Sequence, residues 1–365
     1  MSEREGRSPI ATALITLLVV GAGWYFFSRY DVEGWDQLSV TAKVRDPDGD
    51  AAAASDAVAD ESGTRFVSLD GRVGEPLAAI PISRPFRGAQ SGQDGVDRRS
   101  PGVRVPATNL KIATWALDGL GPTKLSRDFT LNHLVKVLRQ FDIVAVQQVG
   151  VTEKDILPRL VEALNGDSRR YDFLIGRPTG PEDRPERLAF LFDATRVEVD
   201  RSQTYEVDDP QRVLTYRPLV GWFRAAAPPP ERAWTFTVVN ARMDLGQAAS
   251  EVRHLAPLLK AVREDGRGED DVIIAGLFHT DAASLVSAMG SSSVTAVVTG
   301  QPTDVRGRRQ SSNMLLDRHR TTEYVGRGGV FDFLRAFNLD LAEAESVSGQ
   351  LPVYGEFTAT EVGEF

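Results

Sequence analysis

The sequence contains no cysteine, which excludes disulfide bridges, thiolate metal sites and cysteine nucleophiles. Positive charge is also in deficit, with a formal net charge of -9 and a pI near 5.2. Broad binding to nucleic acid depends on Lys and Arg that neutralise phosphates, so nucleic acid is not an expected partner. Lysine is scarce, with 6 residues against 36 arginines, a bias typical of a GC-rich genome. The 365 residues are enough for one large domain or two ordinary domains.

Residues 9 to 27 form a stretch of 19 residues without a charged side chain. As a helix it nearly spans a bilayer core of about 30 Å. Aromatic residues from Trp24 to Phe27, followed by Arg29, are typical of the interfacial end of a membrane anchor. A cleaved signal peptide would have a shorter apolar stretch that ends in small residues. The pattern therefore favours an uncleaved single-pass anchor.

Residues 1 to 8 form a short tail, and basic residues lie on both sides of the anchor, so charge alone does not fix its orientation. The short tail favours an internal N-terminus and an extracytoplasmic body. Residues 28 to 105 are rich in Ala, Asp, Gly and Ser and are expected to form a mostly disordered linker. Within it, residues 65 to 86 are more apolar, and either a short strand or an extended linker fits them.

From residue 106 to 365 apolar runs alternate with amphipathic stretches, which predicts one α/β domain. Apolar residues spaced by three and four predict helices, at residues 131–141, 154–166 and 251–262. Shorter apolar runs predict strands, at residues 110–117, 142–149, 171–176, 187–193, 196–200, 234–243, 271–278, 311–317 and 351–359.

Six segments in this order carry a family resemblance. They are ATWAL (113–117), DIVAVQQV (142–149), VVNARMD (238–244), VIIAGLFHTD (272–281), SSNMLLD (311–317) and SGQLPVYGEF (348–357). Together they resemble the endonuclease/exonuclease/phosphatase superfamily, the fold of DNase I. The corresponding family patterns are T-W-N-L, Q-E-V, V-N-x-H, G-D-F-N, Y-D-x-I-L and S-D-H-x-P-V.

The resemblance implies an α/β fold, a DNase I-like four-layer sandwich of two mostly antiparallel β-sheets flanked by helices. With the predicted anchor, a single transmembrane helix would precede it. The resemblance also implies a site at the sheet edges, where Mg²⁺ and a histidine base hydrolyse phosphoester bonds.

The residues that the family uses for this chemistry are replaced. Gln148 stands for the glutamate that binds the metal, and Ala116 for the asparagine that helps it. The other replaced positions are Arg242 (for His), Leu277 (for Asp), His279 (for Asn), Ser312 (for Asp), Gly349 (for Asp) and Gln350 (for His). Joint loss of ligand, base and orienting groups leaves no mechanism of the family type, and therefore no cofactor is expected.

Two alternatives remain open at these positions. Asp244 and Asp281 are the candidate ligands if a rearranged site still binds Mg²⁺, although Asp281 also fits a cap on the helix that follows it. Arg242 is a candidate for binding an anionic ligand, or it pairs with a neighbouring carboxylate.

Three functions follow from these alternatives. The leading one is a non-catalytic domain at the membrane that binds a protein partner or an anionic ligand through the cleft in which the family has its active site. The second is a metal-dependent phosphodiesterase or phosphatase with rearranged ligands. The third is a structural envelope protein that uses only the outer surface of the domain.

Overall fold

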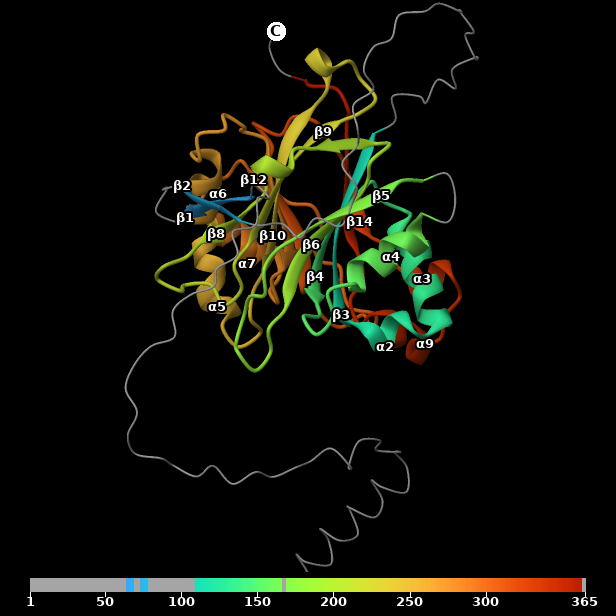
Figure 1. Cartoon of the computed structure of the whole chain (residues 1–365). Helices are drawn as coiled ribbons and strands as arrows, with labels where there is room; N and C mark the ends of the chain where they lie inside the picture. Colours follow the sequence, from blue (N-terminus) through green and yellow to red (C-terminus); the bar gives the residue numbers. More distant parts are fainter. Residues whose placement is uncertain (1–63, 69–72, 78–108, 166–168, 363–365) are drawn as a thin grey trace, which may run out of the picture. The chain divides into compact units, whose positions relative to one another are not determined.

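The computed structural model describes residues 64–68, 73–77, 109–165 and 169–362 (Figure 1). The predicted tail and anchor, and most of the predicted linker, lie outside these residues. Among the residues described, no helix has the length and apolar character needed to cross a membrane.

The strands form two sheets. The larger sheet has nine strands, in the order β12 (Val294–Ala296), β13 (Ser312–Asp317), β11 (Val272–Leu277), β10 (Thr235–Arg242), β9 (Leu219–Ala225), β8 (Tyr205–Asp208), β1 (Thr64–Ser68) and β2 (Val73–Leu77), with β7 (Val197–Val199) also paired to β9. The smaller sheet has six, in the order β14 (Tyr324–Val330), β15 (Val353–Phe357), β3 (Leu110–Leu120), β4 (Ile143–Val149), β6 (Arg187–Asp193) and β5 (Tyr171–Ile175).

Most strand pairs are antiparallel, and the parallel pairs are β3 with β4, β10 with β11 and β1 with β8. The helices are α2 (Pro122–Leu125), α3 (Asp128–Leu138), α4 (Ile156–Leu164), α5 (Ala248–Glu251), α6 (Leu255–Arg263), α7 (Ala282–Met289), α8 (Phe333–Ala336) and α9 (Leu341–Val347). Figure 1 shows α2, α3, α4 and α9 together on one side, and α5, α6 and α7 on the other.

Three apolar cores account for this layering, because the central strands of both sheets, such as β4, β6 and β11, bury both of their faces. One core joins α3 and α4 to the outer face of the smaller sheet, as Leu134 and Leu160 pack with Trp115. Another joins α6 and α7 to the larger sheet. The third lies between the sheets, where Phe190 meets Phe223. The predicted four-layer sandwich is confirmed for the described residues.

The predicted elements are largely found, with two differences. Residues 251–262 were expected to be one helix, but α5 and α6 are separated by a 3₁₀ turn at Val252–His254. Pro257 lacks the N–H that a continuous helix would need there, and it is tolerated in the first turn of a new helix. The strands β1 and β2 fall inside the range expected to be a linker, in the apolar stretch where a short strand was one alternative.

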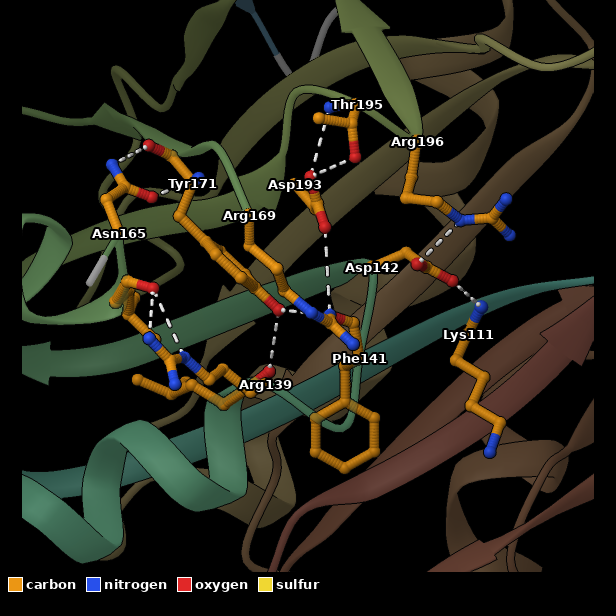
Figure 2. A network of polar contacts seen from close by, with 12 residues as sticks. Lys111, Arg139, Phe141, Asp142, Asn165, Arg169, Tyr171, Asp193, Thr195 and Arg196 are labelled. Carbon is orange, nitrogen blue, oxygen red and sulfur yellow. Dashed lines mark hydrogen bonds and ion pairs between the residues drawn. The ribbon is translucent and has the colours of Figure 1, made fainter. Parts of the chain in front are cut away.

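A polar network fixes the start of β3, β4 and β5 (Figure 2). The hydroxyl of Tyr171 donates to the carbonyl of Phe141 at 2.7 Å. Asp142 accepts from the backbone N–H of Lys111 at 2.8 Å and from Arg196 at 3.1 Å. Asp193 accepts from both the backbone and the hydroxyl of Thr195. Burial raises the pKa of Tyr171, so its hydroxyl stays a donor.

Candidate functional site

Three of the predicted positions lie in one row across the larger sheet. Arg242 is the register partner of Leu277, and Leu277 is the partner of Ser312. All three are nearly inaccessible to solvent, with 6%, 1% and 1% exposure. His279 follows Leu277 by two residues, and its N–H donates to the carbonyl of Ser311 at 2.9 Å.

The other predicted positions gather at the end of the smaller sheet, around Asp118. The Asp118 backbone N–H donates to Gln148 Oε1 at 3.1 Å. Its carboxylate accepts from the backbone N–H of Gly349. The hydroxyl of Ser348 donates to the carbonyl of Ala116 at 2.8 Å. The two positions at which the family pattern has Glu and Asp are therefore joined through a single aspartate.

Contacts between the sheets bring these two groups to one end of the sandwich. Gln147 Nε2 donates to Asn240 Oδ1 at 2.6 Å, which links β4 to β10. The loop before β13 connects them again, since Thr303 Oγ1 accepts from Ser312 N–H at 3.0 Å and Val305 N–H donates to Gly349 O at 3.0 Å. We call this end the strand-end site, made of Ala116, Gln148, Arg242, Leu277, His279, Ser312, Gly349 and Gln350.

Three non-glycine residues at this end have a left-handed backbone. Asp118, Gln148 and His279 have φ of 44°, 63° and 55°. Such conformations cost on the order of 1–3 kcal/mol each and concentrate at functional sites. The strand ends therefore keep a strained geometry in the absence of the family side chains.

Arg242 is engaged by a carboxylate. Its Nε donates to Glu186 Oε2 at 3.0 Å and its Nη2 to Glu186 Oε1 at 3.3 Å, a two-pronged ion pair. The guanidinium also stacks 4.2 Å from the ring centre of Tyr216 and donates to the carbonyl of Met243. The alternative that Arg242 pairs with a neighbouring carboxylate is confirmed, and an anion would have to displace Glu186.

His279 is held in its neutral form. Burial, with Arg242 and Arg309 nearby, lowers its pKa to about 4, against the opposing effect of Asp244. Its Nε2 atom is buried and has no hydrogen-bond partner. At neutral pH the imidazole is therefore an uncharged group with one free ring nitrogen.

The candidate metal ligands Asp244 and Asp281 have other roles. Asp281 is the N-cap of α7, where its carboxylate accepts from Ser284 N–H at 2.8 Å. These bonds hold the pKa of Asp281 below its usual range. Asp244 follows β10, accepts from Gly246 N–H at 2.8 Å and lies 3.7 Å from Arg184. The capping alternative for Asp281 is thus confirmed.

A half-buried ammonium group contributes to the same end. Lys124 Nζ donates to the carbonyls of Leu117 at 2.6 Å and Val347 at 2.9 Å. Burial lowers the pKa of Lys124, and Asp118 opposes this shift. The amine joins the ends of β3 and α9 where they meet the strand-end site.

Sequence reasoning missed the partner of Arg242. Glu186 lies in a segment rich in Pro, Asp and Glu that has no apolar period, so nothing local marks it. Lys124 was also missed, because a lysine in a short helix normally faces solvent.

Several buried side-chain atoms at or beside the strand-end site lack hydrogen-bond partners. They are Gln147 Oε1, Tyr216 Oη, His279 Nε2, Ser312 Oγ and Gln350 Oε1. Unpaired buried polar atoms are few in folded proteins, and each calls for an explanation. Two cavities lie elsewhere in the domain, one of about 470 Å³ beside α6 and one of about 560 Å³ beside residues 178–182. No residue of the strand-end site lines either cavity.

The donor set at this end does not fit a divalent cation. Glu186 is bound by Arg242, Asp118 by Gly349, and Asp244 lies beside Arg184. In the described part of the chain, the group of three acidic side chains close enough to share a metal lies at a different place. A hard cation needs several anionic or carbonyl oxygens that point to one centre.

One glycine at this end is required by packing. Gly276 pairs with Ala241 between β10 and β11, and a Cβ on Gly276 would lie 1.9 Å from the carbonyl oxygen of Ala241. No side chain can be accommodated there unless the two backbones move apart.

Comparison with known proteins agrees with this architecture. Deoxyribonuclease gamma of Rattus norvegicus is 25% identical over 263 residues, which cover 68% of this chain and 84% of that protein. Deoxyribonuclease-1 of Bos taurus is 26% identical over 262 residues, which cover 67% of this chain and 91% of that protein. The chain has the DNase I-like fold of the endonuclease/exonuclease/phosphatase superfamily.

No protein-family model matches the chain. Solved structures similar to this DNase I-like domain include an endonuclease/exonuclease/phosphatase of Bacteroides vulgatus, with 12% identity and a TM-score of 0.49, covering 70% of this chain and 100% of that one.

Proposed function

We propose that this DNase I-like domain is catalytically inactive, is tethered to a membrane by residues 9–27, and acts as a binding or scaffold module. Its ligand is a protein partner or an anionic molecule at the strand-end site. The observation that carries the proposal is that Arg242 and Asp244 at this end have ion-pair partners, Glu186 and Arg184, while neutral buried atoms there lack partners.

Because the charged groups are paired, neither a general base nor a free metal ligand is available for hydrolysis. A general base works best when its pKa is near the working pH, and His279, with a pKa near 4, is a weak proton acceptor at neutral pH. Glu186 is held by the guanidinium of Arg242, which is 6% exposed. Freeing that carboxylate for a metal would leave a buried arginine without its counter-ion.

The unpartnered atoms favour binding. Ser312 offers a hydroxyl, His279 a ring nitrogen, and Gln147 and Gln350 amide oxygens. A ligand that completes these hydrogen bonds would remove the cost of leaving buried polar groups unpaired.

The second candidate is a metal-dependent phosphodiesterase with rearranged ligands. The free Nε2 of His279, close enough to Asp244 for the carboxylate to affect its pKa, is the observation that favours it. Because the relatives are deoxyribonucleases, DNA is the substrate to test first.

The deciding experiment measures hydrolysis of DNA and of an aryl phosphodiester by the full chain in detergent, with Mg²⁺ or Mn²⁺. Deoxyribonuclease-1 of Bos taurus is the positive control. We expect no turnover above background, either for the natural chain or for Gln148→Glu. Chelator-sensitive turnover that His279→Ala abolishes would favour the phosphodiesterase instead.

The tether is tested by fractionation of cells that express the full chain or a chain without residues 1–30. We expect the full chain in the membrane fraction, released by detergent but not by high salt, and the shortened chain in the soluble fraction. Protease added outside intact cells should digest the body. Recovery of the full chain in the soluble fraction would exclude the tether.

A further inference from the structure

Two buried and one half-buried acidic side chain lie at the other end of β10 and β11 from the strand-end site. Asp271 immediately precedes β11, Glu323 lies just before β14, and Glu361 follows β15. One oxygen from each carboxylate lies within 4.8 Å of the others. The six residues of β11 place this group about 20 Å from His279.

Each carboxylate is oriented by a donor on one of its oxygens. Trp234 Nε1 donates to Asp271 Oδ2 at 2.8 Å, the N–H of Val362 to Glu323 Oε1 at 2.6 Å, and that of Thr235 to Glu361 Oε2 at 3.4 Å. The remaining oxygens of Asp271 and Glu323 are buried and have no hydrogen-bond partner. This arrangement is typical of metal ligands, which are held in place by outer hydrogen bonds.

Nothing in the described part of the chain neutralises this charge. No lysine, arginine or histidine there forms an ion pair with Asp271, Glu323 or Glu361. Asp271 and Glu323 are 3% and 1% exposed. Buried carboxylates without a cationic partner must be neutralised, either by protons or by a bound cation.

A neutral side chain gives independent support for a ligand. Thr321 is 1% exposed, and its hydroxyl faces the carboxyl group of Asp271. Its Oγ1 atom nevertheless completes no well-aligned hydrogen bond. The Thr321 hydroxyl can at most donate to Asp271, so the lone pairs of its buried oxygen accept no hydrogen bond and provide a fourth oxygen for an ion.

We propose that Asp271, Glu323 and Glu361, with Thr321, form a calcium-binding site. All of the donors are oxygens, which selects a hard cation. Ca²⁺ accepts irregular, protein-only sets of oxygen ligands, whereas Mg²⁺ keeps several waters and is rarely enclosed by protein alone. The bound ion joins the start of β11, the turn before β14 and the segment after β15, and it stabilises their contact.

Terbium luminescence provides a direct test, because Tb³⁺ replaces Ca²⁺ and is excited by a nearby indole. Trp234 already contacts Asp271. The full chain in detergent, freed of metals with chelator, should show saturable terbium emission that Ca²⁺ reverses. Trp234→Phe should lose the emission and, because it also removes a hydrogen bond to Asp271, should need a higher Ca²⁺ concentration for the same increase in Tm.

The variant Glu361→Gln removes one ligand charge with little change in shape. We expect it to weaken terbium binding by about tenfold or more, because affinity follows the charge of the ligands. Without Ca²⁺ its Tm should equal or exceed that of the natural chain, since repulsion is relieved. With Ca²⁺ the gain in Tm should be lost. Glu264→Gln, at a carboxylate that is 62% exposed on the surface, is the matched control and should behave as the natural chain does.

Each of three results would overturn the proposal. They are the absence of saturable emission, equal terbium affinities for Glu361→Gln and Glu264→Gln, and a gain in Tm with Mg²⁺ but none with Ca²⁺. None of these measurements depends on the activity or the ligand of the strand-end site.

Discussion

The polar network around Tyr171 and the strand-end site are both clusters of polar side chains at the ends of strands. They differ in whether their buried polar atoms have hydrogen-bond partners. In the network of Figure 2, no side chain among the labelled residues carries a buried polar atom without a partner. At the strand-end site, His279, Ser312 and Gln350 each leave one unpaired. Satisfied networks are expected where a cluster serves folding, and unsatisfied ones where a cluster serves a ligand.

Backbone conformation separates the two regions in the same way. Gln148 and His279 at the strand-end site, and Asp118 beside it, have positive φ, whereas none of the labelled network residues does. The comparison assigns the network around Tyr171 to stability and supports the proposed ligand-binding role of the strand-end site. Substitutions in the two regions should therefore have effects of different size and sign.

The largest effect is expected in the network. Asp193→Ala removes a buried acceptor of the Thr195 backbone and hydroxyl, at 3.0 and 2.7 Å, and the partner of Arg169 at 3.7 Å. We expect the free energy of unfolding to fall by about 3 kcal/mol, measured by denaturant unfolding. The control Glu198→Ala, at a half-exposed ion pair with Arg224, should cost less than about 1 kcal/mol. Equal losses of stability for Asp193→Ala and Glu198→Ala would contradict the stabilising role of the network.

A smaller effect, which depends on pH, is expected from His279. Its pKa is lowered from 6.5 to about 4 in the fold, so the unfolded chain binds more protons between these values. The contribution of neutral His279 to the free energy of unfolding is therefore fully present above pH 6.5 and is lost as pH falls toward 4. The control is His279→Asn, because asparagine tolerates a positive φ and does not titrate in this range. Relative to this variant, the free energy of unfolding of the natural chain should fall by on the order of 2 kcal/mol between these pH values. If the free energies of unfolding of the two proteins change with pH in the same way across this range, the lowered pKa of His279 is contradicted.

The smallest effect is expected at Ser312. Its hydroxyl is buried and unpaired, so Ser312→Ala should change stability by less than about 1 kcal/mol, with a stabilising sign. The matched variant Thr303→Val removes a hydroxyl that accepts from the N–H groups of Ser311 and Ser312, at 2.8 and 3.0 Å. That change should cost about 2 kcal/mol, because it leaves buried donors unpaired. A destabilising Ser312→Ala would show that its hydroxyl has a partner in solution.

The fold was predictable because its signals are local. The spacing of Leu131, Leu134 and Leu138 predicts a helix before any contact is known, and α3 is found there. Residues 142–149 and 271–278 read as strands, and β4 and β11 occupy them. The 3₁₀ turn between α5 and α6 was less accessible, because the apolar period continues across it.

The site was predictable only as a set of positions. Register places Arg242, Leu277 and Ser312 side by side, at a sheet edge as the family resemblance implied. Their partners come from segments without a pattern, such as the residues around Glu186. The calcium-site residues Asp271, Glu323 and Glu361 are spread over 91 sequence positions, and no spacing rule connects them.

The tight contact at Gly276 restricts how this segment can vary. At Gly276 any added side chain collides with the carbonyl oxygen of Ala241 in the neighbouring strand. Random substitution at this one position should therefore yield almost exclusively unfolded protein, whatever the domain does. A glycine in this segment is a signature of sheet assembly, and its presence in a sequence carries no information about catalysis.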